Sequence, residues 1–248
     1  MVGGPAAADA VARARRLPHL RVGLHLVLVD GRPVLPAGES GGLVGGDGEF
    51  ERNLLRAGLR FFFLPQIRRR LAREIRAQFE AFRATGLGLD HVDAHKHMQL
   101  HPTVARLAIE IGRDYGMIAM RVPAEPAAAL RAAFPGEPRR PPFHRPWVER
   151  LRRRLRRAGL AAADQVFGIA WSGGMTEERV MRLLPHLPEG VSEIYFHPAA
   201  RGSARLGAAM PGYRHGDELA ALVSPAVARR IAELDIALKS YRDLAPPR

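Results

Sequence analysis

The sequence predicts an α/β fold built on a parallel sheet, either open or closed into a barrel. The short apolar, valine-rich segment at 20–29 is typical of a strand buried on both faces, and a further strand is expected at 191–196. Residues 66–84 and 102–116 carry apolar side chains at the spacing of amphipathic helices. Strands that alternate with helices indicate a parallel sheet. A chain of 248 residues can bury one large core, so we expect a single domain over 1–248.

The first third of the chain gives these elements in order. Residues 5–17 are helix-like and precede the strand at 20–29. Residues 31–48 are rich in Gly and Pro without periodicity, which predicts a long loop. The helix over 66–84 ends at Gly86. It presents apolar side chains at spacings of four and three: Ile67, Leu71, Ile75, Phe79 and Phe82.

The middle of the chain contains a scaffold segment and an irregular one. Pro102 at a first helical turn begins the next helix, and we expect a strand at 117–122 to follow it. Residues 124–163 are rich in Pro and Arg, so we expect an insertion there. The aromatic run at 61–63 is expected in the core, with a lipid-facing or dimer surface as the alternative.

The last third returns to the alternating pattern. Thr176, followed by two glutamates, is a suitable cap for a helix through Leu184, because first-turn acids complement the helix dipole. The strand at 191–196 comes next. Ser224 then begins a final helix to Leu234, and a last strand is expected at 235–241.

Composition limits the chemistry. The chain has no cysteine, so a metal site must use His, Asp, Glu or water. The net charge of +13 would suit a nucleic acid. However, Lys96 and Lys239 are the only lysines, Arg, Ala, Gly and Pro are abundant as in GC-rich genomes, and no aromatics are interleaved with the arginines. We therefore expect no specific nucleic-acid partner and a solvated or membrane-surface basic face at Arg150 to Arg157.

Nothing in the sequence suggests a signal peptide or a membrane span. Residues 1–6 lack a basic region followed by an apolar stretch, and the longest apolar runs are too short to cross a bilayer. We expect a soluble, cytoplasmic protein, and peripheral contact with the inner membrane surface stays open. A homodimer also stays open.

The richest segment in chemical groups is 89–102, which holds four histidines and two aspartates. If this segment is extended, alternation places Asp93, His95, His97 and Gln99 on one face. Such a face would line one wall of a site with metal-binding or proton-transfer groups.

Two further histidines lie in or after predicted strands, His25 in the first and His197 at the end of 191–196. A lone strand histidine is more often a core residue. Three strands of one parallel sheet with histidines near their carboxyl ends, however, would converge on the edge where ligands usually bind. Imidazoles with a carboxylate suit a catalytic divalent metal, and Asp93 would either orient His95 or bind the metal itself.

Three motifs in this order resemble the YdjC-like carbohydrate deacetylase family, relatives of chitooligosaccharide deacetylases. They are Gly23-Leu24-His25-Leu26, Asp93-Ala94-His95-Lys96-His97 and Phe196-His197-Pro198-Ala199. The stretches 59–65 and 213–215 and the Ala-His-Lys-His form of the central motif, at 94–97, are similar to its hopanoid-biosynthesis-associated branch. The likeness covers nearly the whole chain, and the combination is specific although each short motif alone is weak.

The resemblance implies a distorted (β/α) barrel that removes the N-acetyl group of an amino sugar by hydrolysis. It implies one divalent metal ion, Mg or Zn, and a substrate such as a glycosylated hopanoid or a related glycolipid. By motif matching, His25 and His95 are the metal ligands. His197 is the candidate acid that protonates the departing amine. The remaining candidates, for orienting ligands or holding the substrate, are Asp93, His97 and Arg121.

The chain departs from the family pattern at its start. The family begins with a strand ending in an Ala-Asp-Asp-Phe-Gly-like motif, whose acids provide a third metal ligand and the general base. A piece of about 30 residues, comparable to a βαβ unit, would carry this strand and the following helix, and it is absent from this sequence. Either the true start lies upstream of Met1, or the chain is a catalytically impaired relative that binds a sugar or lipid.

Overall fold

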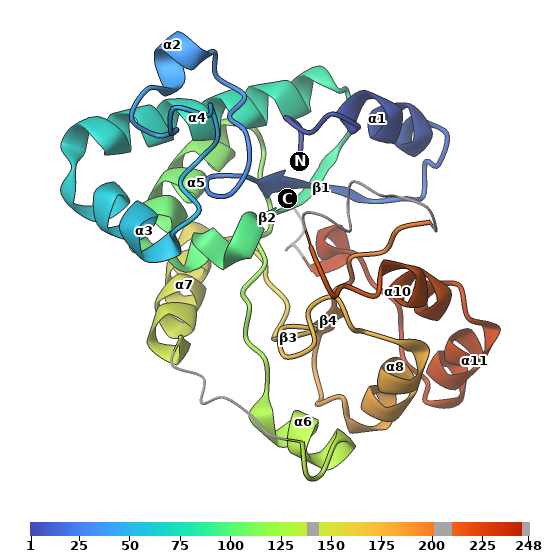
Figure 1. Ribbon diagram of the computed structural model, residues 1–248. Helices are drawn as coiled ribbons and strands as arrows, with labels where there is room; N and C mark the ends of the chain where they lie inside the picture. Colours follow the sequence, from blue (N-terminus) through green and yellow to red (C-terminus); the bar gives the residue numbers. More distant parts are fainter. Residues whose placement is uncertain (138–143, 201–209, 245–248) are drawn as a thin grey trace. The chain divides into compact units, whose positions relative to one another are not determined.

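The computed structural model describes residues 1–137, 144–200 and 210–244 (Figure 1). The chain divides into two compact units. Unit 1 comprises 1–121, 144–162 and 240–248, and unit 2 comprises 122–143 and 163–239. The single domain over 1–248 and the insertion at 124–163 stay predictions. Part of that insertion, 138–143, lies outside the described residues.

Unit 1 is built on parallel strand pairing. Strand β1 (Val22–Leu26) pairs with β2 (Leu89–Ala94), with His25 opposite Asp93. Isolated parallel bridges join Val92 to Met120 and Ala119 to Ala161. The chain crosses from β1 to β2 through helices, as parallel neighbours require. The α/β class and the first strand are therefore confirmed, whereas 117–122 forms bridges rather than a full strand.

Helices α4 (Pro65–Ala84) and α5 (Pro102–Asp114) confirm the predicted amphipathic pattern. The five apolar side chains expected on one face of α4 are all buried. His101 caps α5, because its Nδ1 accepts a hydrogen bond from the backbone N–H of Thr103. The other helices of unit 1 are α1 (Ala7–Arg15), α2 (Ala37–Ser40), α3 (Leu54–Phe63), α7 (Arg145–Ala158) and the short 3-10 helix η3 (Tyr241–Leu244).

Three expectations from the sequence were wrong. The histidine segment leaves the extended conformation at Ala94 and turns into a 3-10 helix, η1 (His95–Leu100), so the alternating wall does not form. Residues 235–241 contain no strand, and 241 begins η3. Of the aromatic run, Phe61 is buried but Phe62 and Phe63 are exposed, because α3 presents them on its outer side.

Unit 2 repeats the parallel pairing on a smaller scale. Strand β3 (Gln165–Phe167) pairs with β4 (Ser192–Ile194), so the strand expected at 191–196 is shorter than predicted. Thr176 and Ser224 cap α8 and α11 as expected. Phe134, Phe167 and Met175 belong to its core. Its helices are α6 (Ala127–Ala133), α8 (Glu177–Leu183), η2 (Leu184–His186), α10 (His215–Leu222) and α11 (Pro225–Glu233).

No helix in the described part of the chain is both long and apolar enough to cross a membrane.

Two buried polar side chains of α4 fix the chain that leaves β1. Gln78 accepts a hydrogen bond from the N–H of Val27 and donates one to the carbonyl of the same residue. Glu74, which is fully buried, accepts from the N–H groups of Val34 and Leu35 and from the amide of Gln78. These bonds replace strand pairing that the backbone lacks after Leu26. They hold the loop that carries Asp30 against α4.

We expect Gln78→Ala to lower the free energy of unfolding by roughly 3 kcal/mol, because both polar backbone groups of Val27 lose their partner. Gln66→Ala is the matched control: Gln66 lies exposed in the first turn of α4, and its loss should cost at most about 0.5 kcal/mol. Urea unfolding followed by circular dichroism measures both. Equal unfolding midpoints would contradict this account of the loop.

Candidate functional site

The centre of the candidate site is a hydrogen-bonded pair of side chains on neighbouring strands. The Nδ1 of His25 lies 2.9 Å from Oδ1 of Asp93, its register partner on β2. The Asp93 side chain is only 8% exposed, whereas that of His25 is 29% exposed. Directly opposite residues on adjacent strands project to the same face, which is why the two side chains meet. His25 is therefore oriented by Asp93 and partly open to solvent.

Arg121 completes this group from the segment on the other side of β2. Its Nη1 donates a hydrogen bond to Oδ2 of Asp93, so each carboxylate oxygen has a cationic or imidazole partner. Burial alone would raise the pKa of Asp93, but the hydrogen bond from His25 and the charges of His25 and Arg121 hold it well below its usual range. Asp93 is thus an anion throughout the neutral pH range.

The two central-motif histidines lie in the turn after β2. The rings of His95 and His25 have centroids 5.8 Å apart at an interplanar angle of 71°. Lys96 and His97 have φ values of 52° and 54°, in the left-handed region that residues with a Cβ rarely adopt. Such conformations cluster at functional sites. The chain therefore leaves the strand direction directly after β2, at the residue whose ring lies beside that of His25.

His97 is part of the same group. Burial and the nearby charge of Arg121 lower the pKa of His97 to about 4, although Asp93 opposes this shift. Its imidazole is therefore neutral at neutral pH. Gln99, expected on the same wall, is fully buried, and its amide nitrogen lies 3.5 Å from the carbonyl oxygen of Arg121. Gln99 thus supports the backbone beside the site.

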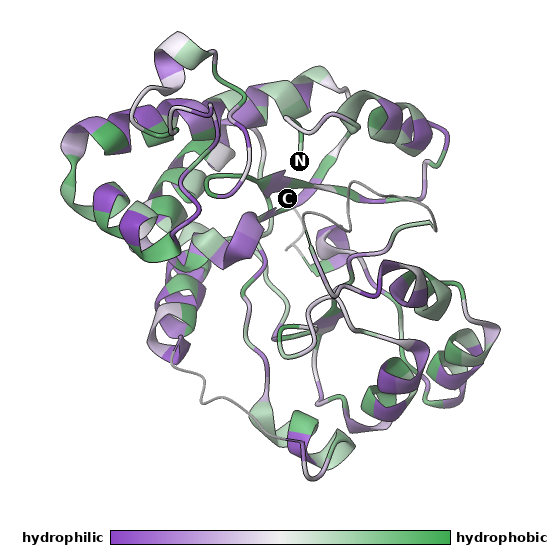
Figure 2. Cartoon of the chain, in the orientation of Figure 1, coloured by the Kyte–Doolittle hydropathy of each residue, from purple (hydrophilic) through white to green (hydrophobic). Residues whose placement is uncertain are grey.

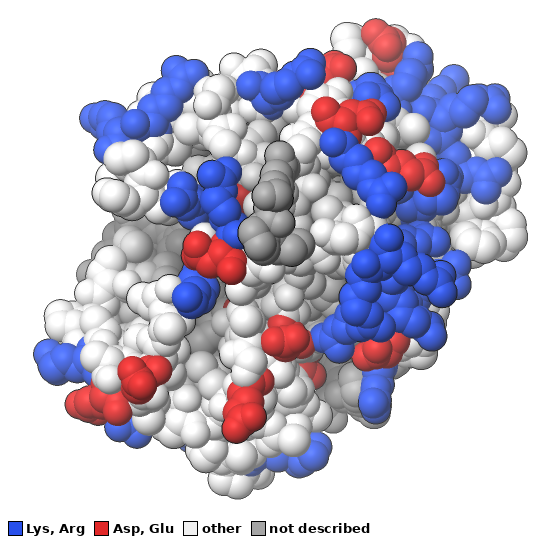
Figure 3. All heavy atoms as spheres, turned by 180° about the vertical axis from the view of Figure 1, so that it is seen from behind, with Lys and Arg blue, Asp and Glu red and all other residues white. Residues whose placement is uncertain are grey.

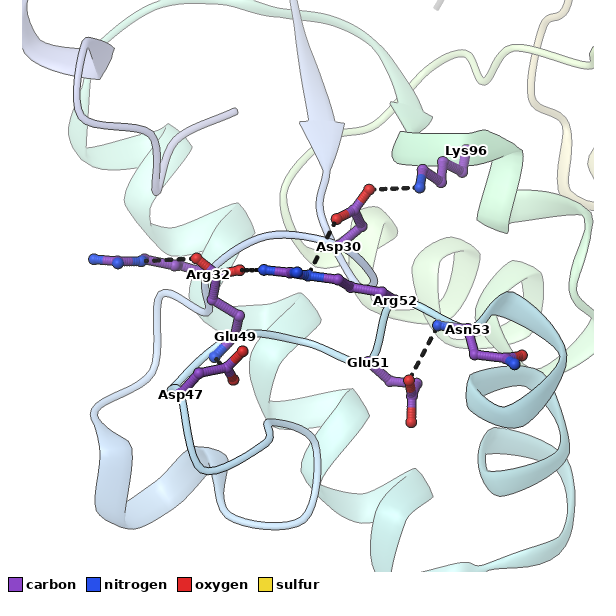
Figure 4. A network of polar contacts seen from close by, with 8 residues as sticks. All are labelled: Asp30, Arg32, Asp47, Glu49, Glu51, Arg52, Asn53 and Lys96. Carbon is purple, nitrogen blue, oxygen red and sulfur yellow. Dashed lines mark hydrogen bonds and ion pairs between the residues drawn. The ribbon is translucent and has the colours of Figure 1, made fainter. Parts of the chain in front are cut away.

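Asp30 is a site residue that the sequence analysis did not identify. It follows the buried run after β1, and its carboxylate accepts a hydrogen bond from the ammonium of Lys96 (Figure 4). That bond, more than the charges of Lys96 and His95, lowers the pKa of Asp30. Arg52 lies 3.9 Å from the other carboxylate oxygen and joins it to Glu49. The position of Asp30 after the carboxyl end of a predicted strand is the signal in the sequence that could have identified it.

His197 lies in unit 2, after β4, with its own set of neighbours. Its backbone N–H donates to the buried carboxylate of Glu218, which also accepts from the N–H of Met175. The Nδ1–H of His215 donates to the carbonyl of His197. The ring centroids of Tyr213 and His197 lie 5.1 Å apart, and the rings meet edge to face at an interplanar angle of 68°. The motif residues at 213–215 are therefore close neighbours of His197.

The donor chemistry of unit 1 fits part of a metal site. Because Nδ1 of His25 faces a carboxylate, its Nε2 is the nitrogen that would bind a metal, as in many metal-binding histidines. His95 offers a second imidazole near it. Catalytic zinc usually has three protein ligands. Among the described residues, no three His, Asp or Glu side chains converge in a way that could hold an ion. His25 and His95 thus offer two imidazole donors, one fewer than such a site uses.

The fold and site define an α/β protein with an oriented histidine at the end of a parallel strand. The chain belongs to the YdjC-like protein family, whose model matches residues 1–233.

Several named relatives are similar over much of this chain. A carbohydrate deacetylase from Geobacillus stearothermophilus is 29% identical over 245 residues, which cover 98% of this chain and 84% of the relative. One from Brevibacillus brevis is 25% identical over 236 residues, covering 95% and 82%. A third, from Vibrio vulnificus, is 40% identical over 115 residues, covering 46% and 43%.

A solved structure has the same fold. It is a proposed cellobiose-phosphate cleavage protein from Enterococcus faecalis V583, with a TM-score of 0.73 and 22% sequence identity. The match covers 99% of this chain and 86% of that protein.

We expect Arg121→Gln to lower the free energy of unfolding by about 3 kcal/mol, because the Asp93 carboxylate then stays buried without its guanidinium partner. Arg16→Gln, at an exposed arginine of the same unit, should change it by at most about 0.5 kcal/mol. Thermal and urea unfolding of both variants test this. A loss no larger for Arg121→Gln than for the control would show that the pair does not stabilise the site.

Proposed function

We propose that this protein hydrolyses the N-acetyl group of an amino sugar. The observation that carries the proposal is the similarity to named carbohydrate deacetylases across 98% and 95% of this chain. It is supported by the geometry of unit 1, where an anionic Asp93 orients His25 beside His95. The distorted (β/α) barrel of the sequence-based prediction is kept in this proposal, supported by the parallel pairing within each unit.

In this proposal His25 and His95 would hold one divalent metal ion, Mg or Zn. When bound, the metal supplies Lewis-acid activation of water and of the acetamide carbonyl. Asp93 keeps the His25 ring in one orientation, and Arg121 keeps Asp93 ionised and fixed. His97, uncharged at neutral pH, can accept a hydrogen bond from a substrate hydroxyl or donate one. His197 would protonate the departing amine.

The proposed substrate is an amino sugar on a glycosylated hopanoid or a related glycolipid. Three similarities to the hopanoid-associated branch support this choice, at 59–65, at 94–97 and at 213–215. The last stretch packs around His197, the candidate acid. A sugar carried on a lipid also suits a protein with a strongly basic surface, because such substrates lie in membranes that contain anionic lipids.

We expect His25→Ala and His95→Ala each to lower acetate release from an N-acetylglucosamine oligosaccharide by about 100-fold or more. Bound metal, measured by elemental analysis of the purified protein, should fall with the activity. The matched controls are His19→Ala and His186→Ala, which remove exposed histidines and should leave both quantities unchanged.

A chelator should abolish the activity of the unaltered protein, and Zn²⁺ or Mg²⁺ should restore it. Full activity in both His25→Ala and His95→Ala would exclude the proposed metal site. Tight binding of the deacetylated product, with no turnover and no metal, would instead identify the protein as a sugar- or lipid-binding relative.

His197→Gln separates proton transfer from metal binding. We expect kcat for acetate release to fall by about 100-fold while the metal content stays that of the unaltered protein, since the proposed role of His197 is proton donation to the amine. A loss of metal in this variant would assign His197 to the metal site, and an unchanged kcat would remove it from the mechanism.

A further inference from the structure

Helix α3 exposes an apolar face. Its buried side chains, Ala57 and Phe61, pack inward, whereas large side chains at helical spacing are open to solvent. These form the α3 apolar face, with exposures of 72%, 49%, 50% and 64%: Leu55, Leu59, Phe62 and Phe63. Figure 2 shows hydrophobic residues along this helix. Contiguous exposed apolar patches of this kind mark interaction sites.

Helix α7 contributes the opposite chemistry. Val148, Leu151 and Leu155 bury one side of the helix. On its outer side, four arginines line a surface pocket, here called the arginine pocket: Arg150, Arg153, Arg154 and Arg157. Figure 3 shows a broad positive patch over this part of unit 1. A cluster of guanidinium groups is suited to phosphate-bearing ligands.

The arginine pocket has excess positive charge. Among the ion pairs between described residues, none involves these four arginines; the nearby acids Glu149 and Glu110 pair with Arg152 and Arg106. Burial, together with the positive charges of Arg150 and Arg106, lowers the pKa of Arg154, although the charge of Glu110 opposes this shift. The positive charges of neighbouring arginines repel one another. An anionic ligand in the pocket would reduce this repulsion and so stabilise the folded protein.

The α3 apolar face and the arginine pocket meet at the first turn of α5. The ring of His101 lies 6.3 Å from that of Phe62, and the guanidinium of Arg154 donates a hydrogen bond to the carbonyl of Pro102, the next residue. Trp147, 45% exposed, lies one turn before Arg150 on α7. Aromatic, aliphatic and arginine side chains are thus combined on one region of unit 1, as in helices that lie in membrane interfaces.

We propose that this region binds the surface of an anionic lipid bilayer. Lipid phosphates occupy the arginine pocket, and the α3 apolar face enters the boundary between headgroups and acyl chains. A second copy of the chain is the poorer occupant, because a symmetric contact would bring two arginine pockets together, and the nearby acids Glu149 and Glu110 already pair with Arg152 and Arg106. This proposal goes beyond the proposed deacetylation and does not depend on it.

The test is cosedimentation with vesicles of phosphatidylcholine, with and without phosphatidylglycerol, at low and physiological salt. The unaltered protein should bind the anionic vesicles, weaken with salt, and leave neutral vesicles unbound. R150Q/R153Q/R157Q should bind about 100-fold more weakly. F62S/F63S should bind about 10-fold more weakly and keep the salt dependence. Arg154 is left intact because it bonds to the protein backbone.

Matched controls come from other exposed sites. R16Q/R21Q/R229Q removes the same number of positive charges from exposed positions. L222S/V223S replaces two exposed apolar residues, which are 51% and 70% exposed. Both should bind vesicles within about 3-fold of the unaltered protein. Circular dichroism confirms that every variant is folded, and no sugar substrate is present.

Three outcomes would overturn the proposal. One is equal loss in the test and control variants. Another is a concentration-dependent dimer that F62S/F63S dissociates, with no vesicle binding. The third is binding to duplex DNA with no affinity for anionic vesicles. Failure of the deacetylase assay would leave the vesicle result unaffected, so the two proposals fail separately.

Discussion

The carboxylate of Asp93 is the group on which the candidate site depends. It lies almost fully buried on β2 and accepts hydrogen bonds from His25 on β1 and from Arg121 on the opposite side. A buried carboxylate is costly unless its charge is balanced, and here each oxygen has a partner from a different segment. These contacts therefore fix the order and register of three neighbouring segments and orient His25.

Side-chain contacts also position the segments that follow the short strands β1 and β2. The backbone after β1 finds its hydrogen bonds in Glu74 and Gln78 of α4, and this places Asp30 at the end of the strand. The turn after β2 carries Lys96, whose ammonium reaches Asp30. Thus the two segments that leave the paired strands are tied together by a charge pair near His95. Side-chain hydrogen bonding to backbone, rather than sheet extension, positions the site.

The sequence allowed the α/β class and the helices α4, α5, α8 and α11 to be predicted, with Thr176 and Ser224 at the starts of the last two, because periodicity and capping are local properties. The wall of alternating histidines was wrong. The prediction required the extended backbone to continue through 99. A glycine at 96 or 97 would have indicated a left-handed turn, but these positions hold lysine and histidine.

The partnership of Arg121 with Asp93 and the position of Asp30 arise from contacts between distant segments, which a single sequence does not reveal. Helices α3 and α10 were missed for a different reason. The first exposes its apolar face, so its pattern resembles a core segment. The second is short and weakly amphipathic.

The left-handed turn at Lys96 and His97 restricts how this part of the chain can vary. A β-branched side chain at either position would clash with its own backbone, whereas asparagine or glycine would fit without strain. At these positions the backbone conformation therefore limits which residue types fit, whatever the chemistry of their side chains. The conformational cost falls most heavily on Lys96, because histidine, like asparagine and aspartate, occurs more often than most residues in the left-handed region.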